Sequence, residues 1–146
     1  VTNAYRAAMD GYLTLGKDYK FDEAWLGELD SVSHREYCTG YYFDDPMKNP
    51  QLCTLPGYMR EKAYIAIAES YNSETGEAVF VQRNKVSAGD RVEIISPGKL
   101  GRAFDVSLIK NEAGESVPSA PHPMMRFTVQ TPFEVKPGDI MRGSGK

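Results

Sequence analysis

Near the beginning of the chain, apolar residues recur at helical spacing. Over residues 3–15 they follow one face of a helix: Ala4, Tyr5, Ala8, Met9, Tyr12 and Leu13. This spacing predicts a helix that ends at Gly16, a residue type that commonly follows the last helical turn. A second short helix is expected from Asp22, a good N-cap residue, to Asp30. Residues 1–32 are therefore predicted to form a helical arm, whose apolar face packs either on the rest of this chain or on a partner.

From residue 58 onward, short segments alternate between apolar and polar residues, which predicts β-strands. The expected strands are residues 64–68, 77–82, 91–95, 102–109 and 126–130, with turns at 72–76 and 111–114. Short strands separated by Gly and Pro favour a small closed β-barrel, which we assign to residues 58–146. Residues 33–57 contain three prolines and lack a clear period, so we interpret them as a signature segment and linker.

One motif occurs twice in the predicted barrel. Residues 85–92 resemble residues 134–141: in each, a hydrophobic residue precedes a turn that ends in Gly-Asp, and a strand then begins. Glycine allows the positive φ of such a turn, and aspartate can bond back to the local backbone. We therefore interpret Asp90 and Asp139 as turn residues in preference to a catalytic pair of carboxylates.

The charge of the chain is unevenly distributed. The net charge is −3, with −4 in residues 1–57 and +1 in residues 58–146. The predicted barrel therefore lacks the strong basic field of a non-specific nucleic-acid binder, although local basic patches remain possible. We find no spanning apolar run and no signal peptide, and the first residue is Val1. We expect a cytoplasmic protein and interpret the sequence as a piece of a longer one.

The two cysteines, Cys38 and Cys53, match no zinc-binding pattern. Free thiols are expected in a reducing compartment, with a disulfide or a metal site as alternatives. Cys38 and His34 are four residues apart, which on a helix would suggest a nucleophilic dyad. Thr39 and Gly40 favour extended chain, which would separate the two side chains. We therefore predict no catalytic residue and no metal site in this chain.

Several basic and aromatic residues are candidates for binding or docking. Residues 33–43 mix an arginine with tyrosines that could stack on bases, or that could bury against the barrel or a neighbouring domain. Two cations lie where one predicted strand ends, and a histidine lies between two prolines. The candidates are His34, Arg35, Tyr37, Tyr41, Tyr42, Arg83, Lys85 and His122.

These motifs together resemble the C-terminal portion of peptidase family U32, the collagenase-like group. The matching stretches are residues 33–37, 39–43, 81–85, 89–90, 120–123 and 137–142. The resemblance implies a β-barrel similar to the second domain of elongation factor Tu, and a catalytic domain that is missing from this sequence. Residues 1–31 would be the tail of that domain. Cys38 stands where the family more commonly has threonine.

The resemblance implies two kinds of activity for the parent protein. Some family members are described as peptidases acting on collagen-like substrates, and others as tRNA-modifying proteins that hydroxylate a wobble uridine. Related members hold an iron–sulfur cluster through cysteines of the missing domain, and none of those ligands maps onto this chain, so we expect no cofactor here.

Three functional hypotheses follow. The first is a non-catalytic accessory barrel that docks to the missing catalytic domain and helps hold a peptide or collagen-like substrate. The second is a tRNA-binding module of a tRNA-hydroxylation protein, for which Arg83 and Lys85 are the candidate contacts. The third is an interaction barrel that self-associates through the apolar stripe of residues 4–13.

Overall fold

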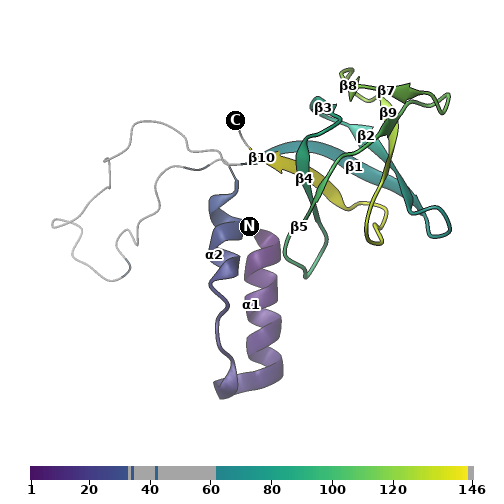
Figure 1. The fold of residues 1–146 in the computed structure, drawn as a ribbon. Helices are drawn as coiled ribbons and strands as arrows, with labels where there is room; N and C mark the ends of the chain where they lie inside the picture. The colour runs from purple at the N-terminus through teal and green to yellow at the C-terminus, as the bar shows by residue number, and fades with distance from the viewer. Residues whose placement is uncertain (33, 35–41, 43–61, 145–146) are drawn as a thin grey trace.

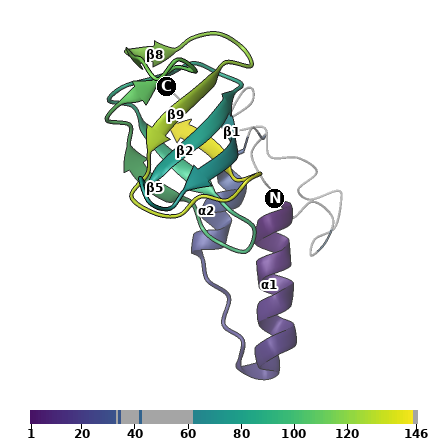
Figure 2. The same cartoon turned by 90° about the vertical axis from the view of Figure 1, so that its right-hand side faces the viewer.

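Two helices form a hairpin beside one end of a β-sheet (Figure 1, Figure 2). The computed structural model describes residues 1–32, 34, 42 and 62–144. Helix α1 (Thr2–Leu15) continues into a short 3-10 helix, η1 (Gly16–Asp18), and helix α2 (Ala24–Asp30) runs back alongside α1. Both helices predicted from the sequence are therefore confirmed.

The ends of the helices follow from local chemistry. Gly16 has a φ of 57°, and its N–H bonds to the carbonyl of Tyr12, so this glycine ends α1 as predicted. Helix α2 begins two residues after Asp22, whose Oδ1 accepts the N–H of Ala24 at 2.9 Å. Asp22 thus bonds to the start of α2 as expected, but the N-cap position is occupied by Glu23 and the regular helix begins slightly later than predicted.

Within residues 62–144, eight strands form one antiparallel sheet in the order β5-β4-β10-β1-β2-β9-β6-β7, and β3 pairs with β8 separately. The strands are β1 (Lys62–Asn72), β2 (Glu77–Gln82), β3 (Val86–Ser87), β4 (Arg91–Ile95), β5 (Arg102–Asp105), β6 (Ile109–Lys110), β7 (Ser116–Val117), β8 (Ser119–Ala120), β9 (Arg126–Gln130) and β10 (Ile140–Ser144). The first and last strands, β1 and β10, are neighbours near its middle.

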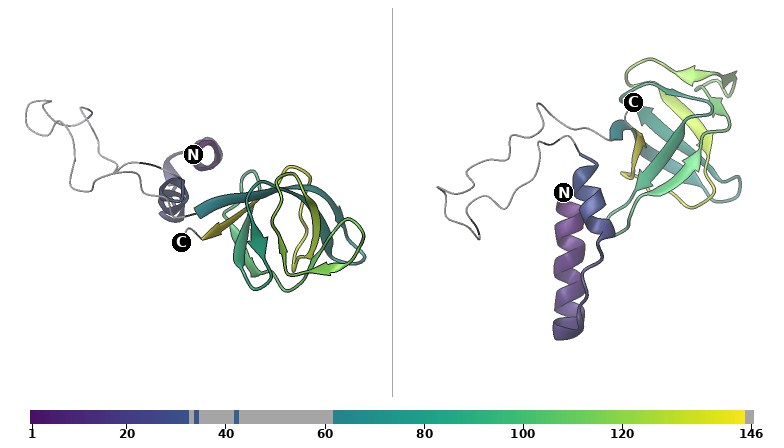
Figure 3. Two further views of the ribbon diagram at one scale, coloured as in Figure 1. Left: turned by 90° about the horizontal axis from the view of Figure 1, so that it is seen from above. Right: turned by 60° about the vertical axis from the view of Figure 1, so that its left-hand side comes forward.

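Alternation along the strands directs one face of the sheet inward. In β2, every second residue is buried, as expected when one side of a strand faces a core. The rings of Phe80 and Phe127 stack there, with centroids 5.7 Å apart. Ile94, Ile109 and Met141 are also fully buried. Figure 3 shows the sheet curling around this core as a half-barrel.

The sequence located β2, β4 and β9 to the residue. The prediction of one strand over residues 102–109 was wrong, because β5 ends at Asp105 and β6 begins at Ile109. Between them, Val106 leaves the ladder: its carbonyl accepts the N–H of Gly89 and its N–H bonds to the carbonyl of Asp90. Among the described residues no ladder joins β5 to β7, so the antiparallel sheet is confirmed at the level of a half-barrel.

The repeated Gly-Asp motif forms two turns of the same geometry. Gly89 and Gly138 have φ values of 89° and 90°. Asp90 Oδ2 accepts the N–H of Ser87 at 2.8 Å, and Asp139 Oδ2 accepts the N–H of Lys136 at 3.0 Å. The strands after the two turns, β4 and β10, pair with each other. The interpretation of both aspartates as turn residues is therefore supported.

Candidate functional site

Arg142 joins the helical arm to the sheet. It lies on β10, and its side chain is only 8% exposed. Its two terminal nitrogens each donate to a carboxylate oxygen of Glu28, on α2, at 2.8 Å. Nε and Nη2 also donate to Glu93 Oε2, on β4, at 3.0 and 2.8 Å. Nη1 also lies 2.8 Å from Ser31 Oγ, so one guanidinium connects α2, β4 and β10. We call this cluster of Arg142, Glu28, Glu93 and Ser31 the Arg142 joint.

The charges in this joint stabilise one another. Burial by itself raises the pKa of Glu93, but hydrogen bonds from Lys62 and Arg142 outweigh burial, and the pKa lies below its usual value. Burial likewise opposes ionisation of Arg142, while the hydrogen bonds to Glu28 and Glu93 raise its pKa. The Glu93 carboxylate and the Arg142 guanidinium are therefore both charged at neutral pH.

A second contact lies at the N-terminal end of the arm. Asn3 Oδ1 accepts the N–H of Gly98 at 2.6 Å, and Asn3 Nδ2 donates to the carbonyl of Lys99 at 3.1 Å. Both partners belong to the turn between β4 and β5. One asparagine thus holds the backbone of this turn, and the side chains of the turn remain available for other contacts.

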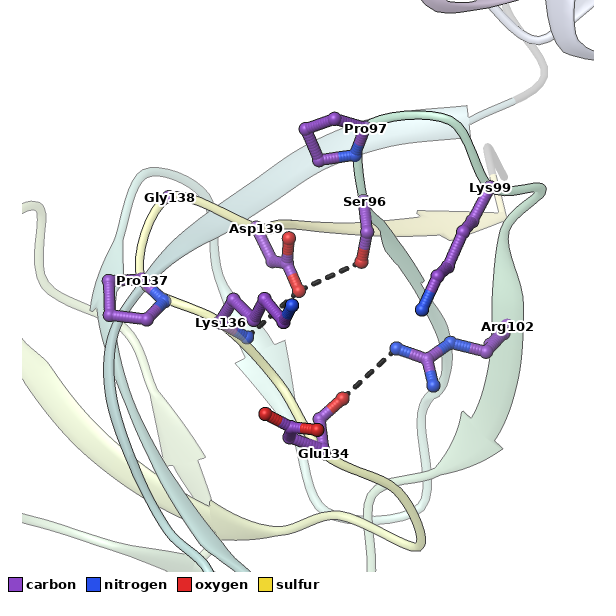
Figure 4. Close-up of a pocket in the computed structure, with 9 residues that line it drawn as sticks. All are labelled: Ser96, Pro97, Lys99, Arg102, Glu134, Lys136, Pro137, Gly138 and Asp139. Atoms are coloured by element: carbon purple, nitrogen blue, oxygen red, sulfur yellow. Dashed lines mark hydrogen bonds between the residues drawn. The ribbon is translucent and has the colours of Figure 1, made fainter. Parts of the chain in front are cut away.

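Those side chains line a pocket of about 450 Å³, which we call the cationic pocket (Figure 4). Its polar lining residues are Ser96, Lys99, Arg102, Glu134, Lys136 and Asp139. The pairing of β4 with β10 explains why these lining residues lie together. Ile95 lies opposite Ile140, so the residues that follow β4 are adjacent to the residues that precede β10.

Arg102 has a fixed position in this pocket. Its guanidinium carbon lies 4.0 Å from the centroid of the Phe133 ring, and Nη2 donates to the carbonyl of Glu134 at 3.0 Å. Its Nε is buried and has no hydrogen-bond partner among the described residues. The side chains of Lys99 and Lys136 reach into the same space (Figure 4).

The three cations of the pocket differ from most other cations of the sheet in having no ion-pair partner among the described residues. Within the described part of the chain, none of the ion pairs involves Lys99, Arg102 or Lys136. Two other hollows, of about 420 and 500 Å³, also contain cations, but each of those cations forms an ion pair. The pairs there are Lys110–Glu77, Arg126–Glu69 and Arg91–Asp105.

The binding residues predicted from the sequence lie in two regions. Arg83, Lys85 and His122 are exposed on the sheet domain. Arg83 Nη1 lies 2.7 Å from the sulfur of Met124, two residues after His122, and the N–H of Met124 donates to the carbonyl of Gln82 at 3.1 Å. The structure therefore brings Arg83 to the loop that contains His122.

The other candidates lie in or next to the segment after α2. His34 Nδ1 donates to the carbonyl of Val32 at 2.7 Å, and its Nε2 lies 4.0 Å from Asp30. Tyr42 is 85% exposed. Three further candidates lie outside the described residues: Arg35, Tyr37 and Tyr41. Their proposed roles stay predictions.

Both cysteines, Cys38 and Cys53, also lie outside the described residues. In the part of the chain that is described, no three His, Cys, Asp or Glu side chains gather in a way that would hold a metal ion.

Sequence reasoning missed both the Arg142 joint and the cationic pocket. The repeated motif pointed to the second Gly-Asp turn, next to Lys136, and Ser96-Pro97-Gly98, a run typical of a turn, could have pointed to the loop of Lys99. These signals indicated where two loops begin, but they did not show that the loops are adjacent. The pairing of β4 with β10 supplies that information.

The fold is an antiparallel sheet curled into a half-barrel, with a helical arm before it. The model of the peptidase family U32 C-terminal domain matches residues 60–142, and the model of peptidase family U32 matches residues 1–51. The chain therefore belongs to peptidase family U32.

A curated protein matches almost the whole chain. The chain is 23% identical over 142 residues to "tRNA hydroxylation protein P1" of Bacillus subtilis (strain 168), covering 97% of this chain and 34% of that protein. It thus spans about a third of the length of this curated relative.

Two solved structures also match, both of the C-terminal domain of a Geobacillus thermoleovorans protein described as a U32 peptidase. One, a selenomethionine variant, is 28% identical with a TM-score of 0.53, covering 55% of this chain and 98% of that one. The other is 25% identical with a TM-score of 0.53, covering 57% of this chain and 92% of that one.

Among the described residues, neither helix is long and apolar enough to cross a membrane.

Proposed function

We propose that this chain is the non-catalytic C-terminal accessory part of a U32 protein, and that it helps hold a tRNA for a catalytic domain elsewhere in that protein. The observation that carries the proposal is the similarity to a tRNA hydroxylation protein across 97% of the chain. Lys99, Arg102 and Lys136 support it, because cations that form no ion pair with a described carboxylate are available to phosphates.

The helical arm is the proposed connection to the catalytic domain. Helix α1 exposes large apolar side chains, with Tyr5 63%, Tyr12 58% and Leu13 76% exposed. A contiguous apolar face of this kind marks an interaction surface. Its proposed occupant is the rest of the U32 domain, because the family model already matches residues 1–51 and the curated relative is about three times as long as the matched region.

The sheet domain is proposed to close into a barrel like the second domain of elongation factor Tu. The curled half-barrel and its antiparallel order support this, since closure would protect the edges of β5 and β7. In this arrangement the turns at either end of the barrel would present the candidate contacts.

The experiment is a titration of the 146-residue chain with fluorescently labelled tRNA, read by anisotropy at about 50 and about 200 mM salt. With a net charge of −3, only a few phosphate contacts are expected. Three contacts would give a slope of log K against log salt of about −2 to −3. Absence of binding at the lower salt would contradict the tRNA proposal.

The sequence-predicted contacts are tested in the same titration. The double variant Arg83→Ala, Lys85→Ala is expected to weaken binding, and an unchanged affinity would remove these two residues from the proposal. A second candidate, a peptide or collagen-like substrate, is favoured by the description of the two solved structures as U32 peptidase domains. Binding of gelatin fragments by a chain that does not bind tRNA would favour that candidate.

A further inference from the structure

The cationic pocket contains one rigid donor group. Arg102 is held between the Phe133 ring and the carbonyl of Glu134, so its guanidinium loses little freedom when a ligand binds. A planar guanidinium matches the oxygens of a phosphate and binds it with parallel hydrogen bonds. The described contacts use one of its five donors, which leaves hydrogen-bonding capacity on a fixed group.

Two flexible cations accompany it. Lys99 and Lys136 are both exposed, and both side chains reach into the pocket. Lys99 leaves a turn whose backbone is held by Asn3, and Lys136 precedes the second Gly-Asp turn. Ordered backbone therefore brings the lysines to the pocket, while their long side chains can adjust to the ligand.

The two carboxylates of the lining, Asp139 and Glu134, reduce this charge without cancelling it, because the lining contains three cations. Asp139 is 3% exposed, and its Oδ2 accepts the hydroxyl of Ser96 at 2.8 Å and the N–H of Lys136 at 3.0 Å, so it is used within the fold. Glu134 is exposed and forms no ion pair with a described residue. Its negative charge at the rim should weaken the binding of an anion.

We infer that the cationic pocket binds a phosphate group, with Arg102 as the fixed contact and Lys99 and Lys136 as mobile contacts. The source of the phosphate rests on the proposed function: it would be the backbone of the tRNA. Phosphate contacts position a nucleic acid without reading its sequence. The pocket would therefore orient the tRNA relative to the arm, whose Asn3 binds the same turn.

The test uses the full 146-residue chain and two probes, labelled tRNA and inorganic pyrophosphate. Lys99→Ala with Lys136→Ala removes two contacts from exposed positions, where the fold should tolerate the change. Each lost contact should weaken tRNA binding about five- to eightfold at about 0.1 M salt, or about 25- to 60-fold for both, and reduce the salt slope by about 1.5. The matched control is Lys17→Ala with Lys20→Ala, two exposed lysines of the arm, which should change neither value appreciably.

Two further variants sharpen the test. Arg102→Met keeps an apolar side chain against Phe133 and should abolish pyrophosphate-induced NMR shifts of the Gly98 and Gly138 amides. Glu134→Gln should strengthen binding of both probes, because it removes a repelling charge at the rim. A merely structural role for the lysines would not produce opposite effects from the Lys and Glu variants.

The outcomes separate the pocket from the proposed function. Loss of tRNA binding in the double lysine variant, with the control unchanged, supports both. If the double lysine variant still binds tRNA as tightly as the unchanged chain, the inference that the pocket binds a tRNA phosphate is contradicted, while the proposed function is not. Pyrophosphate binding at the pocket without any tRNA binding supports a phosphate site and overturns tRNA as its source. Binding of neither probe overturns the inference and the tRNA proposal together.

Discussion

Replacing Arg142 by methionine should release the helical arm from the sheet. The change removes the guanidinium that contacts both Glu28 and Glu93, whose side chains are only 14% and 23% exposed. Two partly buried carboxylates would then lose a shared counter-charge. Removing one partner of a buried ion pair costs about 3–5 kcal/mol, and the lower value is appropriate because Lys62 still contacts Glu93. About 3 kcal/mol corresponds to a fall of about 6–12 °C in the melting temperature of a chain of this size.

The chain contains a natural probe for this change. Its single tryptophan, Trp25, lies on α2, so tryptophan fluorescence reports the arm while far-UV circular dichroism reports the sheet as well. In the unchanged protein, fluorescence and circular dichroism should give the same urea midpoint of unfolding. In Arg142→Met, the fluorescence midpoint should fall further than the dichroism midpoint, because the arm loses its main attachment first.

A matched variant and a rescue decide whether the reasoning is correct. Arg91→Met breaks an ion pair with Asp105 whose side chains are 64% and 68% exposed, and it should cost less than about 1 kcal/mol. Adding Glu28→Gln to Arg142→Met should recover part of the loss, because it removes one of the uncompensated carboxylates. If Arg142→Met were no more destabilising than Arg91→Met, or if the two signals still coincided, the role of Arg142 as the joint would be refuted.

Two other predictions concern the same joint. The folded pKa of Glu93 lies below its ordinary value of 4.5, so its contribution to stability is present above that value and is lost as the pH falls through the folded pKa. Melting temperatures followed from about pH 7 to about pH 3 should therefore decline at the acidic end, and this decline should be smaller in Arg142→Met; equal declines would contradict the assignment. A Cβ at Gly101 would lie 2.6 Å from Glu93 Oε2 and 2.9 Å from Arg142 Nη2, so Gly101→Ala should cost about 1–3 kcal/mol in urea unfolding. The control Gly27→Ala, in a helix with nothing within 4 Å of the added carbon, should be neutral or stabilising by up to about 1 kcal/mol, and equal losses for the two glycines would exclude a steric cause.

The sequence predicted best those features that depend on neighbouring residues. Strand β2 was located to the residue because its alternation is strict and a turn precedes it, and Gly16 marked the end of α1 because the positive φ there is a local requirement. The predicted strand over residues 102–109 failed for the opposite reason. Its break at Val106 is caused by hydrogen bonds to the distant turn at Gly89 and Asp90.

The candidate site was missed because it also depends on contacts between residues that are distant in the sequence. Arg142 and Glu28 are 114 residues apart in the chain, and no local pattern connects them. Lys99 and Lys136 meet only because β4 pairs with β10 in one particular register. A sequence does not show which charged residues will pair with an opposite charge, so the cations without an ion-pair partner among the described residues could be identified only from the structure.

The position of β10 in the sheet has a consequence for synthesis on the ribosome. This strand is made after the other nine described strands, yet it lies between β1 and β4 and carries Arg142. Until β10 has left the exit tunnel, β1 lacks its partner on one side, Met141 is missing from the core, and the arm has no guanidinium to bind. Pairings between the ends of a sequence form slowly, because a long loop must close first. We therefore expect that nascent chains ending before residue 140 remain protease-sensitive, and that the arm and the sheet acquire protection together.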